Sequence, residues 1–255
     1  MQSFINKPPE LAGTGVQSRE VRYRDHRIHY LTAGSGGPPL VLVHGGASDC
    51  TDWVPTMSAL SDRFTMYAPD LPGFGRSDRR ETGYYLTDFF EFLEEFVSLM
   101  GVERTALVGH SFGARVCLGV ALERPDLVSR LVMVDGAGLG KTSWFGVALL
   151  TAFDKARQLL HKPLLNPTFL TREGDDPDWA CVEDLPKLRV PTLLIWRQRD
   201  PYLPLDNARR AVDLIPDARL EIMPGLGHAP HRTYADAFYR LVREFLDGTG
   251  VSPAE

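Results

Sequence analysis

Two patterns of apolar residues alternate along this chain of 255 residues. Short continuous runs of Val, Leu and Ile predict strands that are buried on both faces. Longer segments with apolar residues three or four positions apart predict helices that cover these strands. Because strands and helices alternate, we expect an α/β fold with a mostly parallel sheet flanked by helices. The predicted strands lie within 38–46, 64–78, 104–111, 128–136, 191–201 and 218–228.

The two ends of the chain and one central segment add further elements. Residues 20–33 alternate polar and apolar positions, which predicts an antiparallel hairpin at the start of the sheet. Residues 86–100 place their Leu, Phe, Val and Met side chains on one stripe of a helix. Residues 231–247 are predicted to close the chain as another helix.

The rhythm of strands and helices breaks at residues 137–188, which are too many for a simple crossover between two strands. Within them, residues 143–161 read as a helix that is apolar around most of its circumference, and such a helix needs cover on several sides. We therefore predict a core domain formed by residues 1–136 and 189–255, with a short helical cap at 137–188. The alternative is an ordinary crossover helix followed by a surface loop.

Composition and charge remove several classes of function. The net charge is −5 and no basic run occurs, which argues against binding to nucleic acid. The three cysteines are widely spaced and form no CxxC pair, as expected of reduced thiols in a cytoplasmic protein. No secretory signal and no apolar run of about 20 residues is seen, so we expect no membrane partner. The oligomeric state cannot be read from the sequence.

A serine between two glycines marks the first candidate for chemistry. Gly109-His110-Ser111-Phe112-Gly113 fits the pattern G-x-S-x-G, and it follows a predicted strand and opens a predicted helix. In this context the serine sits on a sharp turn, and larger residues two positions away would collide with neighbouring elements. We predict that Ser111 is a nucleophile presented at the C-terminal end of the strand.

A serine hydroxyl is a weak nucleophile and needs a base, which we assign among seven histidines. His228 follows the last predicted strand on a Gly-rich loop that can bring its imidazole over the serine, and His231 is the alternative. His110 is adjacent to Ser111 and should point away from it, whereas His44 is expected to hold its own loop by hydrogen bonds. The remaining histidines belong to the hairpin or the cap: His26, His29 and His161.

The imidazole in turn needs an acid that orients it. Asp200 comes directly after the strand that contains "TLLIW", and Asp135 ends the strand that contains "LVMV". An acid at either strand end could reach the same histidine, so both remain candidates, and we favour Asp200. The order Ser111, Asp200, His228 is nucleophile, acid and base along the chain.

An acyl-transfer reaction also needs donors for the oxyanion that develops in the transition state. The backbone N–H of Phe112 at the start of the helix is one candidate. The second is predicted to be the N–H of Gly46, because Gly45 and Gly46 in "HGGASD" let the backbone approach closely.

These stretches together resemble the α/β-hydrolase fold superfamily, in the branch of small esterases, lactonases, haloperoxidase-like enzymes and C–C bond hydrolases. The resemblance implies an eight-stranded, mostly parallel sheet, a Ser–His–Asp triad, no cofactor or metal, and a substrate pocket between core and cap. One departure is Arg197, where the family usually has Gly, so the loop that carries Asp200 can differ in shape. The matching stretches are "PLVLVHGG", "APDLPGFGRSD", "LVGHSFGARV", "PTLLIWRQRDPYLP" and "MPGLGHAPH".

The expected activity is that of a serine hydrolase cleaving a small-molecule carboxylic ester or lactone through an acyl-enzyme intermediate. Members of this fold that use a carboxylate nucleophile, such as epoxide hydrolases, are disfavoured by Ser111. Two alternatives stay open: a C–C bond hydrolase of ring-cleavage diketones, which the short cap disfavours, and a ligand-binding protein with little turnover.

Apolar and aromatic residues near these motifs are candidates for lining the substrate pocket, although simple packing is an equally good interpretation of each. Asp70 and Asp78 are predicted to be structural and to tie the loop beneath the site. The pocket candidates are Gly45, Trp53, Phe112, Trp144, Phe145, Phe153, Phe169, Trp179, Leu203 and Leu226.

Overall fold

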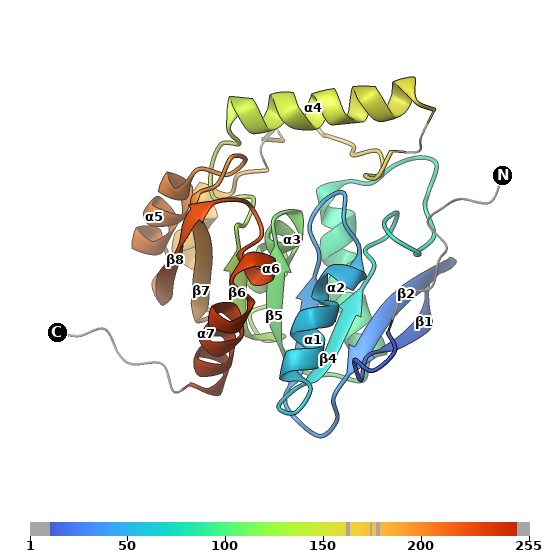
Figure 1. The fold of residues 1–255 in the computed structure, drawn as a ribbon, viewed down its shortest axis with the longest axis vertical. Coiled ribbons are helices and arrows are strands. Elements are labelled where there is room, and N and C mark those ends of the chain that lie inside the picture. Colours follow the sequence, from blue (N-terminus) through green and yellow to red (C-terminus); the bar gives the residue numbers. More distant parts are fainter. Residues whose placement is uncertain (1–10, 162–163, 174, 177–178, 249–255) are drawn as a thin grey trace.

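An eight-stranded sheet forms the centre of the molecule, as a computed structural model of the chain shows (Figure 1). The structure describes residues 11–161, 164–173, 175–176 and 179–248, apart from the side chains of Leu150 and Phe153. The strand order is β1-β2-β4-β3-β5-β6-β7-β8. The strands are β1 (Gln17–Tyr23), β2 (His26–Ala33), β3 (Pro39–Val43), β4 (Thr65–Pro69), β5 (Thr105–His110), β6 (Val128–Val134), β7 (Thr192–Arg199) and β8 (Ala218–Leu226).

Strand pairing follows the sequence prediction. The predicted hairpin is formed by β1 and β2, in which Val21 pairs with Ile28, and β2 pairs antiparallel with β4. All other neighbours in the sheet are parallel. The mostly parallel eight-stranded α/β fold is therefore confirmed.

Helices cover both faces of the sheet, and each face has its own apolar core. Alternate residues of a strand enter opposite cores, as Leu107 and Val108 of β5 do. One face is covered by α2, α3 and α5, and the other by α1 and α7. The helices outside residues 137–188 are η1 (Cys50–Trp53), α1 (Val54–Leu60), α2 (Leu86–Leu99), α3 (Phe112–Glu123), α5 (Leu205–Leu214), α6 (Pro230–Thr233) and α7 (Ala235–Asp247).

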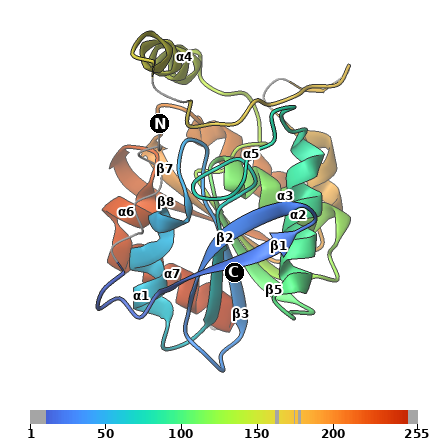
Figure 2. The ribbon, with the colours of Figure 1, turned by 90° about the vertical axis from the view of Figure 1, so that its right-hand side faces the viewer.

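The segment between β6 and β7 carries α4 (Trp144–Leu159) and η2 (Val182–Lys187). Helix α4 stands apart from the core above one end of the sheet (Figures 1 and 2). Its N-terminus is held by Ser143, whose N–H donates to the carbonyl of Tyr202 at 2.8 Å. Trp144 is 82% exposed and Leu159 81%, so this apolar helix lacks the cover that we expected from its sequence.

The last predicted helix is divided in two. Tyr234 lies between α6 and α7, and its backbone angles, φ −127° and ψ 46°, are not helical. The pattern of apolar residues continues across this break, which is why the sequence indicated one helix. Among the described residues, no helix is both long and apolar enough to cross a membrane.

Candidate active site

Four functional candidates meet at one edge of the sheet because parallel strands end on the same side. Ser111 follows β5 and Asp135 follows β6. Asp200 follows β7, and His228 lies two residues beyond β8. Residues that are separated by more than 100 positions in the chain, such as Ser111 and His228, are thereby brought into contact.

The turn at Ser111 has the strained geometry of a nucleophile elbow. Ser111 has φ 51° and ψ −116°, a conformation that L-residues rarely adopt. A Cβ on Gly109 would lie 2.6 Å from Ala114 Cα, and one on Gly113 would lie 2.4 Å from the carbonyl oxygen of His44. The two glycines therefore allow the close backbone contacts that hold the serine at the tip of the turn.

A continuous chain of hydrogen bonds links the serine, the histidine and the favoured acid. The Ser111 Oγ–H donates to His228 Nε2 at 2.9 Å, and His228 Nδ1–H donates to Asp200 Oδ2 at 2.6 Å. The other oxygen of Asp200 accepts the N–H groups of Tyr202 and Leu203 at 2.7 and 3.0 Å. Asp200 is thus held on both oxygens and fixes the tautomer of His228 that can accept the serine proton.

Asp135, the competing acid, lies behind the same imidazole. Its Oδ2 is 4.0 Å from His228 Nδ1, too far for a hydrogen bond, and has no hydrogen-bond partner among the described residues. Its Oδ1 accepts the N–H of Arg197 at 2.7 Å. Burial, together with the nearby charge of Asp200, raises the pKa of Asp135 to about 8. Its environment therefore favours the protonated form of Asp135, whereas the hydrogen-bonded partner of His228 is Asp200.

The raised pKa of Asp135 predicts a pH-dependent loss of stability. In the unfolded chain Asp135 loses its proton above the usual pKa of 3.8, whereas in the folded protein it keeps the proton up to about pH 8. The free energy of unfolding therefore falls as the pH rises from 3.8 to about 8. Asp135→Asn removes this titration while keeping an acceptor for the Arg197 N–H. We expect the variant to gain a few kcal/mol over wild type at about pH 8 and little at about pH 4, because each pKa unit is worth about 1.4 kcal/mol.

Urea unfolding of both proteins across this pH range measures the difference. Circular dichroism spectra of the two folded proteins check that the substitution leaves the fold intact. Parallel stability curves for the two proteins would show that Asp135 is ionised in the native state.

Arg197, the residue that departs from the family pattern, lies beneath the loop that carries His228. Its guanidinium is buried, stacks on the ring of Tyr234 at 4.7 Å, and donates to the carbonyl oxygen of Leu226 at 2.6 Å. A Cβ on Gly227 would lie 3.3 Å from Arg197 Nε. The larger residue therefore braces the loop before His228, and Asp200 still reaches the imidazole.

The candidate oxyanion loop lies against the nucleophile. A Cβ on Gly45 would lie 2.9 Å from His110 Nδ1 and 3.2 Å from Ser111 Cβ, so glycine is required for this approach. A Cβ on Gly46 would lie 3.9 Å from Phe112 Cβ. The Asn166 side chain accepts the N–H of the next residue, Ala47, at 2.6 Å. No motif marked Asn166 in the sequence, because it reaches this loop from the segment between β6 and β7.

The other candidate histidines act as braces. His44 donates from Nδ1 to the carbonyl oxygen of Gly45 at 2.7 Å and accepts the N–H of Leu71 at 3.1 Å, so it holds its own loop as expected. His110 points away from Ser111 and donates from Nε2 to the carbonyl oxygen of His228 at 2.6 Å. Burial, with the nearby charges of His231 and His228, lowers the pKa of His110 well below its usual value. The neutral His110 ring therefore positions the backbone of the catalytic-base candidate.

An aromatic cluster beside the serine includes two residues from the segment between β6 and β7. Phe112 contacts Phe169 and Trp179 with ring centroids 5.2 and 5.1 Å apart, and these two rings lie 5.0 Å from each other. Phe74, which the sequence did not single out, stacks on Phe112 at 6.0 Å. This cluster gives the site an apolar wall beside the elbow.

The remaining pocket candidates include both buried and exposed side chains. Trp53 is fully buried in the core shared with α1 and α7, stacked on Phe238, as expected for the packing alternative. Leu203 is buried beside Asp200, whereas the exposed side chains, with their fractional exposures, are Trp144 (82%), Phe145 (51%) and Leu226 (68%). Phe153 has its side chain outside the described part of the structure.

Comparison with known proteins places these features in a family context. A model of the Alpha/beta hydrolase family matches residues 40–241. An uncharacterized protein of Mycobacterium tuberculosis (strain H37Rv) is 30% identical, over 96% of this chain and 84% of that protein. The 2-hydroxy-6-oxononadienedioate/2-hydroxy-6-oxononatrienedioate hydrolase of Comamonas testosteroni is 26% identical, over 91% of this chain and 95% of that enzyme. Among solved structures, a bacterial membrane phospholipase A superposes with a TM-score of 0.78 at 25% identity, covering 92% of this chain and 87% of that one.

Proposed function

Because the chain belongs to the alpha/beta hydrolase family, we propose that it is a serine hydrolase that cleaves a carboxylic ester or lactone. The observation that carries this proposal is the chain of hydrogen bonds from Ser111 through His228 to Asp200, with links of 2.9 and 2.6 Å. Serine is the nucleophile suited to acyl transfer, and the neutral imidazole is the base that activates it. The substrate is a small molecule, and residues 137–188 form the cap over its pocket.

Acylation begins when Ser111 Oγ attacks the carbonyl carbon and His228 Nε2 takes the serine proton. Asp200 stabilises the imidazolium that forms, and the N–H groups of Gly46 and Phe112 bind the oxyanion of the tetrahedral intermediate. The C–O bond to the alcohol then breaks, the alcohol takes the proton from His228, and the acyl group remains on Ser111.

Deacylation uses the same groups in reverse. His228 Nε2 takes a proton from water, whose oxygen attacks the acyl carbon, and the oxyanion forms again in the same place. The bond to Ser111 breaks, the serine recovers a proton from His228, and the carboxylic acid leaves. The residues of this chain, the substrate and water account for every bond and proton in the two steps.

Three observations favour an ester or lactone substrate. Helix α4 covers the catalytic edge only loosely, with Phe145 half exposed, which suits substrates that do not need full enclosure. A membrane phospholipase A is among the structures similar to this chain. The apolar wall of Phe112, Phe169 and Trp179 suits an acyl or alkyl group beside the serine.

The proposal is tested by stopped-flow release of p-nitrophenol from short-chain p-nitrophenyl esters and by labelling with a fluorophosphonate probe. We expect a burst of p-nitrophenol close to one equivalent of protein, and rapid labelling that peptide mapping places on Ser111. An unlabelled Ser111, or labelling without any turnover of esters and lactones, would favour the ligand-binding alternative.

A second candidate is hydrolysis of a carbon–carbon bond in a ring-cleavage diketone, which the similarity to the Comamonas testosteroni hydrolase favours. The same triad would then act on a vinylogous diketone. The panel of esters and lactones therefore includes such a diketone. A kcat/KM for the diketone far above that for every ester would assign this second activity to the site.

A further inference from the structure

A second group of histidine and carboxylate side chains lies behind His228. Asp52, from η1, and His231, from α6, have side chains that are each only 1% exposed. His231 Nε2–H donates to Asp52 Oδ1 at 3.2 Å, and His110 Nδ1 lies 3.8 Å from Asp52 Oδ2. One nitrogen from each ring and a carboxylate oxygen lie within 4.8 Å of one another, close enough to hold one metal ion after a small adjustment of the side chains.

His110 presents a free lone pair to this group. Its Nε2 contacts the carbonyl oxygen of His228 at 2.6 Å, and because a carbonyl only accepts, Nε2 carries the proton. Nδ1 of the neutral ring is then an acceptor, and it has no hydrogen-bond partner among the described residues although the side chain is only 9% exposed. A ring whose other nitrogen donates to a carbonyl is oriented as metal-binding histidines usually are.

Two members of the group, Asp52 and His231, line a cavity. A cavity of about 560 Å³ lies between η1 and the end of α6, with Asp52, Thr56, His231, Arg232 and Tyr239 in its wall. The Arg232 guanidinium enters from this side and pairs with Asp52 Oδ1, while its side chain is 55% exposed. Arg232 is thus a movable positive charge at the position where a cation would bind, and the cavity leaves room for water as a further ligand.

We propose that His110, His231 and Asp52 form a binding site for a zinc-type divalent cation, entered from this cavity and adjoining the Ser111 site. Two imidazole nitrogens and one carboxylate suit zinc and its transition-metal neighbours, whereas Mg²⁺ and Ca²⁺ prefer ligand sets made of oxygen. Binding displaces Arg232 from Asp52 and removes the proton from His231 Nε2. The inference goes beyond the proposed hydrolase activity, and it departs from the metal-free site that the sequence led us to expect.

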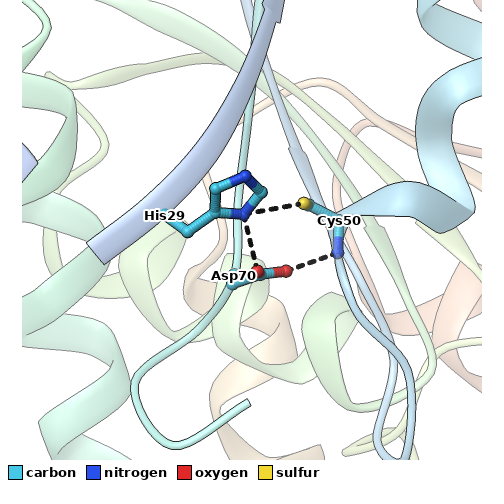
Figure 3. A group of neighbouring side chains, drawn as sticks. All are labelled: His29, Cys50 and Asp70. Carbon is cyan, nitrogen blue, oxygen red and sulfur yellow. Dashed lines mark hydrogen bonds and ion pairs between the residues drawn. The ribbon is translucent and has the colours of Figure 1, made fainter. Parts of the chain in front are cut away.

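Another buried group, formed by His29, Cys50 and Asp70, lacks these properties (Figure 3). His29 Nδ1–H donates to Asp70 Oδ2 at 2.8 Å, while its Nε2 accepts the hydroxyl of Ser18 at 2.8 Å. The other Asp70 oxygen accepts the N–H of Cys50 at 2.7 Å. Burial, with the charge of Asp70, raises the pKa of the Cys50 thiol well above its usual value, which disfavours the thiolate that would bind a metal ion. These residues brace β2 against the loop after β4.

Isothermal titration of metal-free protein with ZnCl₂, and the shift of its thermal midpoint, test the site. Wild type is expected to bind about one Zn²⁺ per chain and to melt at higher temperature with zinc, because the ion binds only the folded site. Asp52→Asn and His231→Gln are expected to weaken binding at least about tenfold. Arg232→Gln is expected to bind zinc several-fold more tightly, since the competing guanidinium is gone. His161→Gln, at an exposed histidine, is the matched control and should bind as wild type does.

Cobalt substitution separates this site from the other candidates. Co²⁺ held by two imidazoles and a carboxylate is expected to show visible d–d bands without the near-ultraviolet charge-transfer band of a thiolate ligand. A thiolate band would place the ion at Cys50, and loss of binding in His228→Ala alone would place it at the triad; either result overturns the proposal. So does unchanged zinc affinity in both Asp52→Asn and Arg232→Gln, the second of which alters only a largely exposed side chain.

Discussion

Replacement of Ser111 by Ala is expected to lower kcat for ester hydrolysis by about 10⁶-fold, because it removes the only atom that forms the acyl-enzyme bond. The residual rate would come from the oxyanion donors and from substrate binding, which the substitution leaves in place. The variant should also lose both the burst of p-nitrophenol and the fluorophosphonate label. The measurement is steady-state and pre-steady-state hydrolysis of a p-nitrophenyl ester.

Ser58→Ala provides the control for this experiment, since Ser58 is an exposed serine on α1. It removes a hydroxyl from an exposed position on that helix and should retain full activity. If Ser111→Ala kept a tenth or more of the wild-type kcat with an unchanged circular dichroism spectrum, the nucleophilic mechanism would be wrong.

Asp200→Asn is expected to lower kcat by about 10³- to 10⁴-fold. The carboxylate accepts the Nδ1–H of His228 at 2.6 Å, so it fixes the tautomer that leaves Nε2 free to accept the proton of Ser111. An amide in its place can donate to Nδ1, which turns the ring into the wrong tautomer and leaves the imidazolium unstabilised. KM should change far less than kcat, because Asp200 touches no substrate atom.

Asp135→Asn is the matched substitution at the second carboxyl. Its Oδ2 is 4.0 Å from His228 Nδ1 and its environment favours the protonated form, so we expect a loss of kcat within about tenfold. For both variants, kcat and the pH dependence of kcat/KM are measured with the same ester as substrate. The opposite ranking, with Asp135→Asn the more damaged variant, would assign the acid to Asp135 and contradict our choice.

The sequence predicted the elements that rest on local pattern. Continuous apolar runs marked the central strands, and alternation over residues 20–33 marked the antiparallel hairpin. The glycines around Ser111 could be interpreted because steric demands at a tight turn act over a few neighbouring residues. The order of Ser111, Asp200 and His228 along the chain could be compared with known hydrolases from the sequence, since each residue follows a recognisable strand.

Local pattern was misleading where partners far away in the chain decide the outcome. Helix α4 was expected to be covered because it is apolar around most of its circumference, yet Trp144 and Leu159 are largely exposed. For Trp53 the sequence left pocket lining and simple packing as equal alternatives, and the tertiary structure places it in the core. Asn166 carried no signal, because its contact with Ala47 depends on how the inserted segment folds back.

What the sequence determined by itself was therefore the α/β layout, the elbow at Ser111 and the order of three candidate catalytic residues. Only the tertiary structure decided between Asp200 and Asp135 as the hydrogen-bonded partner of His228, because both follow parallel strands and only Asp200 lies within hydrogen-bonding distance of Nδ1, at 2.6 against 4.0 Å. It also brought Asp52, His110 and His231 together. The physical reason is that strand-end positions are set by short-range pattern, whereas the direction of each side chain depends on packing between segments distant in the chain.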